Sequence, residues 1–295
     1  MMADRVSRRV FVVAAGAGVT GVALAAAIGS LGRKEAKLTD RIVAARRDGT
    51  PPVDDPVSGR WLDVDPFLVS LLPQRIVPPF LDEAGVGELT VEAMHNGEEL
   101  GFRLGWDDTV PDDLDGINRF HDAVAVQLPA QAGKTPPPVM MGGPGFPVHL
   151  LQWRASWQRD LEGRRQSVEA LYPRVVRDEP PEKILPPEVA ALFYVARVVD
   201  NPLSALERES SVEEIVAEGF GSVTALPEQR ARGNAVHEQG RWAVTIGVPM
   251  ERGAAGARLD PGSIWPVAFA VWLGSNGDRG SRKQYADWVS LELEA

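Results

Sequence analysis

The stretch IWPVAFAVWLGSNGDRGSRKQYADWVSLEL, residues 264–293, decides the fold. Side chains alternate with a period of two at both of its ends, in residues 264–272 and 289–293, which predicts two strands. In the first strand the two faces are Val267, Phe269 and Val271 against Ala268, Ala270 and Trp272. The loop between the strands, residues 273–287, contains Asn276-Gly277 and Arg279-Gly280 and carries Lys283. Because loops held by sheet at both ends often carry function, we expect a functional site here.

The composition favours β structure and excludes several kinds of chemistry. The 24 prolines and 29 glycines imply many turns. The chain has no cysteine, which excludes disulfides, cysteine-ligated iron–sulfur clusters and covalent c-type haem. A net charge of −10 makes nucleic acid an unfavourable partner. No G-x-S-x-G motif occurs, so a hydrolase has no support.

The first 31 residues read as a targeting segment. Ser7-Arg8-Arg9-Val10-Phe11 matches the twin-arginine export pattern, and residues 10–31 follow without a charge. The alanines at 25–27 offer a cleavage site, and the uncleaved apolar run is long enough to anchor the chain in a membrane. We therefore expect a protein that is exported to the periplasm or an equivalent extracytoplasmic space, with membrane anchoring as the alternative to cleavage.

Residues 32–60 are predicted to be a polar linker with a short helix around residues 38–46, and residues 61–295 one domain. Residues 87–106 predict a hairpin that turns at His95-Asn96-Gly97, which would leave His95 exposed. Further strands are expected at residues 122–128 and 242–248.

The middle of the chain is less regular. The proline- and glycine-rich residues 136–147 cannot be helical. Residues 148–157 fit a strand or a helix equally well, and residues 158–217 have a looser helical pattern that we interpret as an insertion. Together these patterns predict an all-β fold, an antiparallel β-sandwich with helical insertions, preceded by an N-terminal export or anchor helix.

Few other polar residues form a recognisable site. His121 and Asp122 are adjacent and would point to opposite faces of a strand, which argues against a catalytic dyad. The acidic residues between 107 and 115 do not have the spacing of a calcium loop and are interpreted as a solvated turn.

The chain resembles a known family in several segments that occur in the family's order. They are ELTVEAMHNGEELGFRLGWDD, RFHDAVAVQLP, VMMGGPGFPVHLLQW, AEGFGSVT, GRWAVTIGVPM, and VAFAVW followed by G-x-x-GDR-x-x-x-K and W-x-x-L-x-L. The resemblance covers residues 61–294. It is to the haem b-binding gamma subunits of ethylbenzene dehydrogenase, dimethyl sulfide dehydrogenase, selenate reductase and chlorate reductase, in the type II dimethyl sulfoxide reductase group.

The resemblance implies that one methionine and one lysine are the axial ligands of a haem b iron. The matching positions are Met141 and Lys283, and a slip of one residue would exchange Met141 for Met140. His149 is the alternative ligand should Lys283 not serve. Such a lysine must lose its proton to bind iron, so its pKa must lie well below the usual ~10.4. Leu273, Ser281, Arg282 and Ala286 depart from the family pattern but remove neither ligand.

The same resemblance implies a non-catalytic electron-transfer subunit. Its partners would be a molybdenum-cofactor catalytic subunit and an iron–sulfur subunit, with a c-type cytochrome or another redox carrier as the external partner. The alternative is an exported carbohydrate-binding-like β-sandwich module without haem, in which Trp153 and Trp157 would stack on a sugar.

Overall fold

The computed structural model describes residues 35–133, 135–176, 181–194, 198–199, 201, 203 and 208–295. The targeting segment predicted over residues 1–31 lies outside the described residues. Within the described part of the chain, no helix is long and apolar enough to cross a membrane. One compact unit runs from Ala36 to Ala295.

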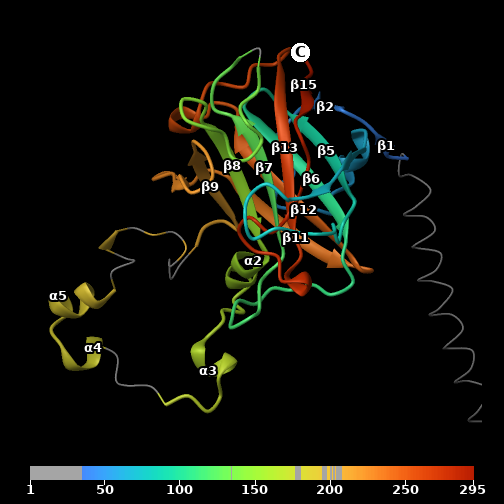
Figure 1. Cartoon of the computed structure of the whole chain (residues 1–295). Helices are drawn as coiled ribbons and strands as arrows, with labels where there is room; N and C mark the ends of the chain where they lie inside the picture. Colours follow the sequence, from blue (N-terminus) through green and yellow to red (C-terminus); the bar gives the residue numbers. More distant parts are fainter. Residues whose placement is uncertain are drawn as a thin grey trace, which may run out of the picture. The chain divides into compact units, whose positions relative to one another are not determined.

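The described elements follow one another as short strands with few helical turns (Figure 1). In chain order they are β1 (Lys37–Leu38), β2 (Arg41–Arg46), η1 (Gly59–Asp63), β3 (Phe67–Ser70), β4 (Leu72–Pro73), β5 (Glu88–His95), β6 (Glu99–Asp107), β7 (Ala123–Pro129), β8 (Val148–Arg154), α2 (Ala155–Leu161), α3 (Val168–Leu171), α4 (Pro181–Ile184), α5 (Pro187–Ala190), η2 (Ala191–Phe193), β9 (Val212–Ala217), β10 (Thr224–Ala225), β11 (Arg232–Glu238), β12 (Arg241–Pro249), η4 (Gly253–Ala255), β13 (Ile264–Trp272), η5 (Gly274–Asn276), β14 (Gln284–Tyr285) and β15 (Val289–Leu293).

The predicted β-sandwich is confirmed, and β13 joins its two sheets. The main hydrogen-bonded path is β10-β9-β8-β7-β13-β15-β2-β5-β6-β12-β11. Residues 264–267 of β13 pair with β15, and residues 268–272 pair with β7. Side chains from both halves of the path form one core, in which the Phe102 ring of β6 lies 6.3 Å from the Phe269 ring of β13. The strand predicted from residues 264–272 therefore connects the two sheets.

The prediction of a helix around residues 38–46 is wrong. Residues 41–46 form β2, which lies between β15 and β5 and runs parallel to both. Ile42 and Ala44 are fully buried in the core. Alanine and arginine favour helix in isolation, but here β15 and β5 each offer an unpaired edge, and pairing with both outweighs local propensity. The sheet unit thus begins ahead of Trp61, and the sandwich is mixed rather than purely antiparallel.

Three further expectations are resolved by tertiary pairing. Residues 148–157 divide into strand β8 and the start of helix α2. Residues 212–217, expected to be helical, form β9 between β8 and β10. His95 is fully buried instead of exposed, because it still belongs to β5 and pairs with Leu100. The short helices α3, α4 and α5 occupy the insertion between β8 and β9, as expected.

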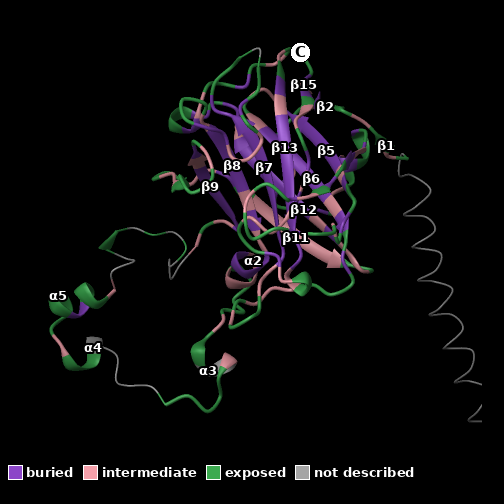
Figure 2. Ribbon diagram, viewed as in Figure 1, coloured by how far each residue is buried: buried purple, intermediate pink, exposed green. Residues whose placement is uncertain are grey.

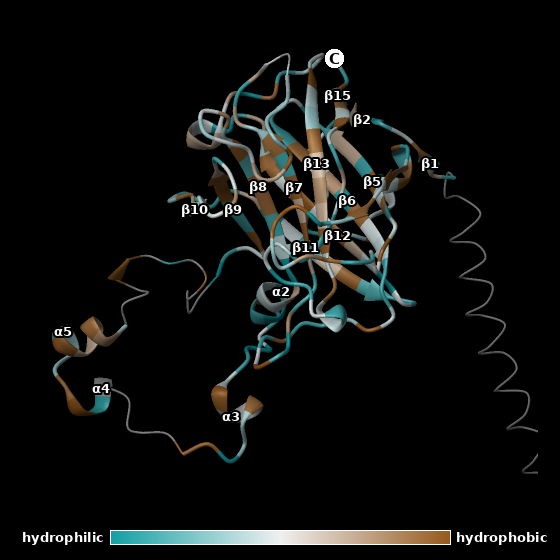
Figure 3. Cartoon of the chain, viewed as in Figure 1, coloured by the Kyte–Doolittle hydropathy of each residue, from teal (hydrophilic) through white to brown (hydrophobic). Residues whose placement is uncertain are grey.

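Strands β7, β8, β9 and β13 are covered on both faces (Figure 2). Their core faces carry Val124, Leu151, Val212 and Phe269. Their other faces carry two small apolar clusters, one with Ala125 and Trp272 and one with Leu150 and Ile215. Hydrophobic residues are correspondingly dense along these strands (Figure 3). A second apolar surface therefore lies outside the sandwich core and beneath the connecting loops.

Candidate functional site

A cavity of about 460 Å³ lies on this second apolar surface. Its floor includes Ala125 of β7, Leu150 of β8, Ile215 of β9 and Trp272 of β13. Four loops complete the walls, at residues 74–77, 140–141, 220–223 and 280–283, together with Leu203. A cavity of this size with a mainly apolar lining is typical of cofactor and small-molecule sites.

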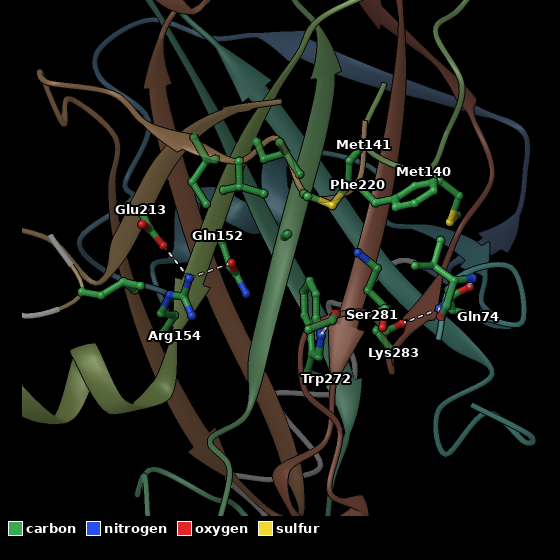
Figure 4. Close-up of a pocket in the computed structure, with 18 residues that line it drawn as sticks. Gln74, Met140, Met141, Gln152, Arg154, Glu213, Phe220, Trp272, Ser281 and Lys283 are labelled. Atoms are coloured by element: carbon green, nitrogen blue, oxygen red, sulfur yellow. Dashed lines mark hydrogen bonds and ion pairs between the residues drawn. The ribbon is translucent and has the colours of Figure 1, made fainter. Parts of the chain in front are cut away.

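Lys283 reaches into the cavity from the loop between β13 and β14 (Figure 4). Its Nζ lies 4.9 Å from the centroid of the Trp272 ring. In the part of the chain that the structure describes, no carboxylate pairs with this amine. Desolvation by burial lowers the pKa of Lys283 to about 8. The fold therefore places Lys283 where its amine loses the proton more readily than the amine of an exposed lysine does.

The backbone around Lys283 is held by a buried glutamine. The Gln74 N–H donates to the Lys283 carbonyl at 3.0 Å, and the Gln74 side-chain amide donates to the Ser281 carbonyl at 2.8 Å. Next to the lysine, β14 pairs with both β13 and β4. The Trp272 indole N–H donates to the Gly280 carbonyl at 3.0 Å. These contacts fix the direction from which the lysine enters the cavity.

Met141 enters the same cavity from the proline- and glycine-rich loop. Its φ is +63°, a left-handed backbone conformation that residues other than glycine rarely adopt. The Gly219 N–H donates to its carbonyl at 2.7 Å, and its side chain packs against the cluster of Leu150 and Ile215. Trp288 holds the loop by donating from its indole to the Pro137 carbonyl at 2.7 Å. Backbone strain kept at a cavity wall is typical of functional positions.

The two methionines point to different parts of the cavity. In Figure 4 the Met141 side chain extends toward the Lys283 amine, whereas the Met140 sulfur lies toward Gln74. Met141 and Lys283, the two positions named by the resemblance, thus line the same cavity. The structure also leaves Met140 at the cavity wall, in a less direct position.

One end of the cavity is polar. Arg154 of β8 pairs with Glu213 of β9 and donates to the Gln152 side-chain oxygen at 3.0 Å. These residues were missed by sequence reasoning, because residues 148–157 did not distinguish strand from helix. Once β8 is a strand, its period of two places Leu150, Gln152 and Arg154 on one face.

The same alternation removes His149 from the site. His149 is fully buried on the core face of β8, where its Nε2 lies 3.1 Å from a Glu214 carboxylate oxygen. It does not line the cavity, so its role as the alternative ligand is wrong. His121 pairs with Asp115 at 2.6 Å and not with Asp122. In the described residues, no group of three or more His, Cys, Asp or Glu side chains is arranged to hold a metal ion.

Trp153 and Trp157 do not form a sugar-stacking surface, since both are buried. Trp153 packs in the core with its ring 5.1 Å from that of Trp242. The acidic segment 107–115 is more engaged than a solvated turn. Asp108 is buried there, and Asp113 forms ion pairs with Arg159 and Arg164.

Comparison with known proteins gives a consistent set of relatives. The ethylbenzene dehydrogenase family matches residues 58–168. A respiratory nitrate reductase haem subunit of Haloferax mediterranei is 23% identical over 79% of this chain and 66% of its own length. The chlorate reductase gamma subunit of Ideonella dechloratans is 24% identical over 71% of this chain and 66% of its own length. The chain therefore spans slightly less than two thirds of each of these curated relatives.

Comparison with solved structures finds similarity at a low level. A carbohydrate-binding protein of Bacteroides uniformis matches with a TM-score of 0.44 and 7% identity, over 88% of this chain and 100% of its own.

Proposed function

Because this chain belongs to the ethylbenzene dehydrogenase-like gamma subunit family, we propose that it is an electron-transfer subunit that binds one haem b. The observation that carries the proposal is the meeting of a thioether and a desolvated amine in one apolar cavity. The two side chains come from loops far apart in the sequence and line the same cavity.

The residues fit a haem iron by their chemistry. We assign Met141 and Lys283 as the axial ligands. The Met141 sulfur is a soft and neutral donor, which favours ferrous iron and raises the reduction potential. The Lys283 nitrogen binds iron only without its proton, and burial has already lowered its pKa to about 8. Apolar side chains such as Leu150 and Ile215 suit the face of a flat macrocycle.

When bound, haem supplies one-electron oxidation and reduction at its iron. The protein's part is to hold both axial positions with its own side chains and to exclude water. The hydrogen bonds from Gln74 and the packing of Trp272 keep the lysine aimed at the cavity. With Met141 and Lys283 both serving as ligands, no position on the iron would remain for a substrate, so we infer that the chain relays electrons.

We further propose the partners and location that suit such a subunit. A molybdenum-cofactor catalytic subunit and an iron–sulfur subunit would exchange electrons with this chain, and a c-type cytochrome or another carrier would connect it to the respiratory system. The relatives named for nitrate and chlorate reductases support this arrangement. Export by the twin-arginine route, with residues 10–31 as a signal or an anchor, would place the subunit outside the cytoplasm.

The test is the optical spectrum of the full chain produced with haem available, in the oxidised and dithionite-reduced states. We expect a low-spin, six-coordinate b-type spectrum at about one haem per chain. Lys283→Ala and Met141→Ala should each remove one ligand and give a high-spin form or lose the haem. Met140→Ala is the matched control and should keep the low-spin spectrum.

A folded chain that takes up no haem would refute the proposal. If Met140→Ala lost the low-spin spectrum and Met141→Ala kept it, the function would stand with the methionine assignment reversed.

A further inference from the structure

A second, smaller cavity of about 120 Å³ continues from the polar end of the first. The two cavities share Gln152, Arg154, Trp272 and Gly280 as wall residues. The smaller one adds His121 and Arg279, together with the carboxylates of Asp115 and Asp278. The site is therefore asymmetric, with an apolar region at Met141 and a charged region beyond Arg154.

Arg154 stands at the junction with part of its guanidinium unused. Its Nη2 donates to Gln152 and Glu213. Its Nε is buried and has no hydrogen-bond partner among the residues that the structure describes. A guanidinium carries five N–H donors in a fixed fork, and a buried donor without an acceptor destabilises the protein. An acceptor group placed in the cavity would remove this destabilisation.

The other charged side chains near this junction differ in whether they already have a partner. Arg279 has no carboxylate partner among the described residues, and its guanidinium lies 4.7 Å from the centroid of the Phe120 ring. The Asp278 Oδ2 accepts from the Leu273 N–H at 3.1 Å and from the Gln284 amide at 2.8 Å, and its Oδ1 lies 3.6 Å from the Arg282 Nε. Asp115 is occupied by His121. Asp278 and Asp115 thus each have a basic partner, Arg282 and His121, and Arg154 and Arg279 are the cationic groups that line the smaller cavity with them.

We propose that Arg154, together with Arg279, binds the carboxylate groups of the haem propionates and so sets the orientation of the macrocycle. This inference rests on the proposed function. The apolar body of the macrocycle would lie between Met141 and Lys283, and its anionic edge would lie at the junction of the two cavities. Arg154 then bridges two carboxylates, that of Glu213 and that of the ligand, which is a geometry that the guanidinium fork favours.

The proposal is tested by comparing iron protoporphyrin IX with its dimethyl ester, which has the same ring and iron but no anionic carboxylates. Each porphyrin is titrated into the full chain and followed by absorption. A charge-assisted hydrogen bond contributes about 1.5–3 kcal/mol, so the wild type should bind the diacid at least about tenfold more tightly than the ester.

The variant for the same experiment is Arg154→Gln combined with Glu213→Gln. Removing Arg154 alone would leave the buried Glu213 without its partner and endanger folding. The double variant should weaken diacid binding about tenfold and leave ester binding unchanged. Arg159→Gln is the matched control, because Arg159 also pairs with a carboxylate and its Nε also has no partner among the described residues, but it lines neither cavity.

Equal affinity of the wild type for the two porphyrins would overturn the inference while the haem-binding function stands. Equal weakening of both porphyrins in the double variant would also overturn it, because that result indicates a structural role for the arginine. If the wild type bound neither porphyrin, the proposed function itself would fail, and the inference with it.

Discussion

Replacing Lys283 by methionine should stabilise the haem-free protein. The pKa of the Lys283 ammonium falls from an ordinary 10.5 to about 8 because burial desolvates the charge. A pKa difference of one corresponds to about 1.4 kcal/mol, so holding the protonated amine in the fold costs about 3 kcal/mol at neutral pH. Methionine keeps a similar chain length against Trp272 without the charge. We therefore expect Lys283→Met to raise the free energy of unfolding at pH 7 by up to about 3 kcal/mol.

The stability difference between the wild type and Lys283→Met should also depend on pH in a defined direction. Below pH 8 the amine is protonated in both the folded and unfolded states, so the full penalty is present. Between pH 8 and about 10.5 the unfolded chain binds more protons than the folded one, so the stability of the wild type rises with pH. Lys283→Met should lack this rise, and the two proteins should converge toward pH 10.

Urea unfolding of the haem-free chains at a series of pH values measures both effects, since bound haem would add its own stabilisation. Lys37→Met on the exposed strand β1 is the control for the loss of one positive charge. If Lys283→Met were no more stable than Lys37→Met at pH 7, the amine would be solvated and the physical basis of the ligand assignment would be refuted.

Three further predictions follow from the same site. Haem affinity, measured by competition at several pH values, should rise about tenfold per pH unit up to about pH 8 and then level off, because Lys283 must lose its proton to bind; a flat profile below pH 8 would argue against an amine ligand. Met141→Gly should have a free energy of unfolding about 1 kcal/mol higher than that of Met141→Ala, measured in urea, because the φ of +63° is strained for alanine and not for glycine. If the alanine variant were the more stable of the two, the loop would not be held in this conformation. Gln74→Ala should cost about 2–3 kcal/mol and weaken the low-spin haem spectrum, because its side chain bonds the Ser281 carbonyl and the 76–77 backbone; a normal spectrum in a destabilised variant would limit Gln74 to a structural role.

The sequence by itself determined the all-β class and the two faces of β13. The alternation of Val267, Phe269 and Val271 with Ala270 and Trp272 is a local property of the backbone, because successive side chains on a strand point to opposite sides. The sequence thus predicted which side chains lie on each face of β13. It did not predict that the second face would also be covered.

Only the tertiary structure decided which strands are neighbours and which polar groups share a cavity. Residues 41–46 pair between β15 and β5 because those edges are available in the folded sheet, a non-local fact that overrides the helical preference of the segment. The removal of His149 from the site depended on the strand assignment of β8, which the periodicity of residues 148–157 left open. Likewise, the desolvation of Lys283 and the half-used guanidinium of Arg154 arise where distant loops and strands meet, since burial and hydrogen bonding depend on neighbours that the local sequence does not contain.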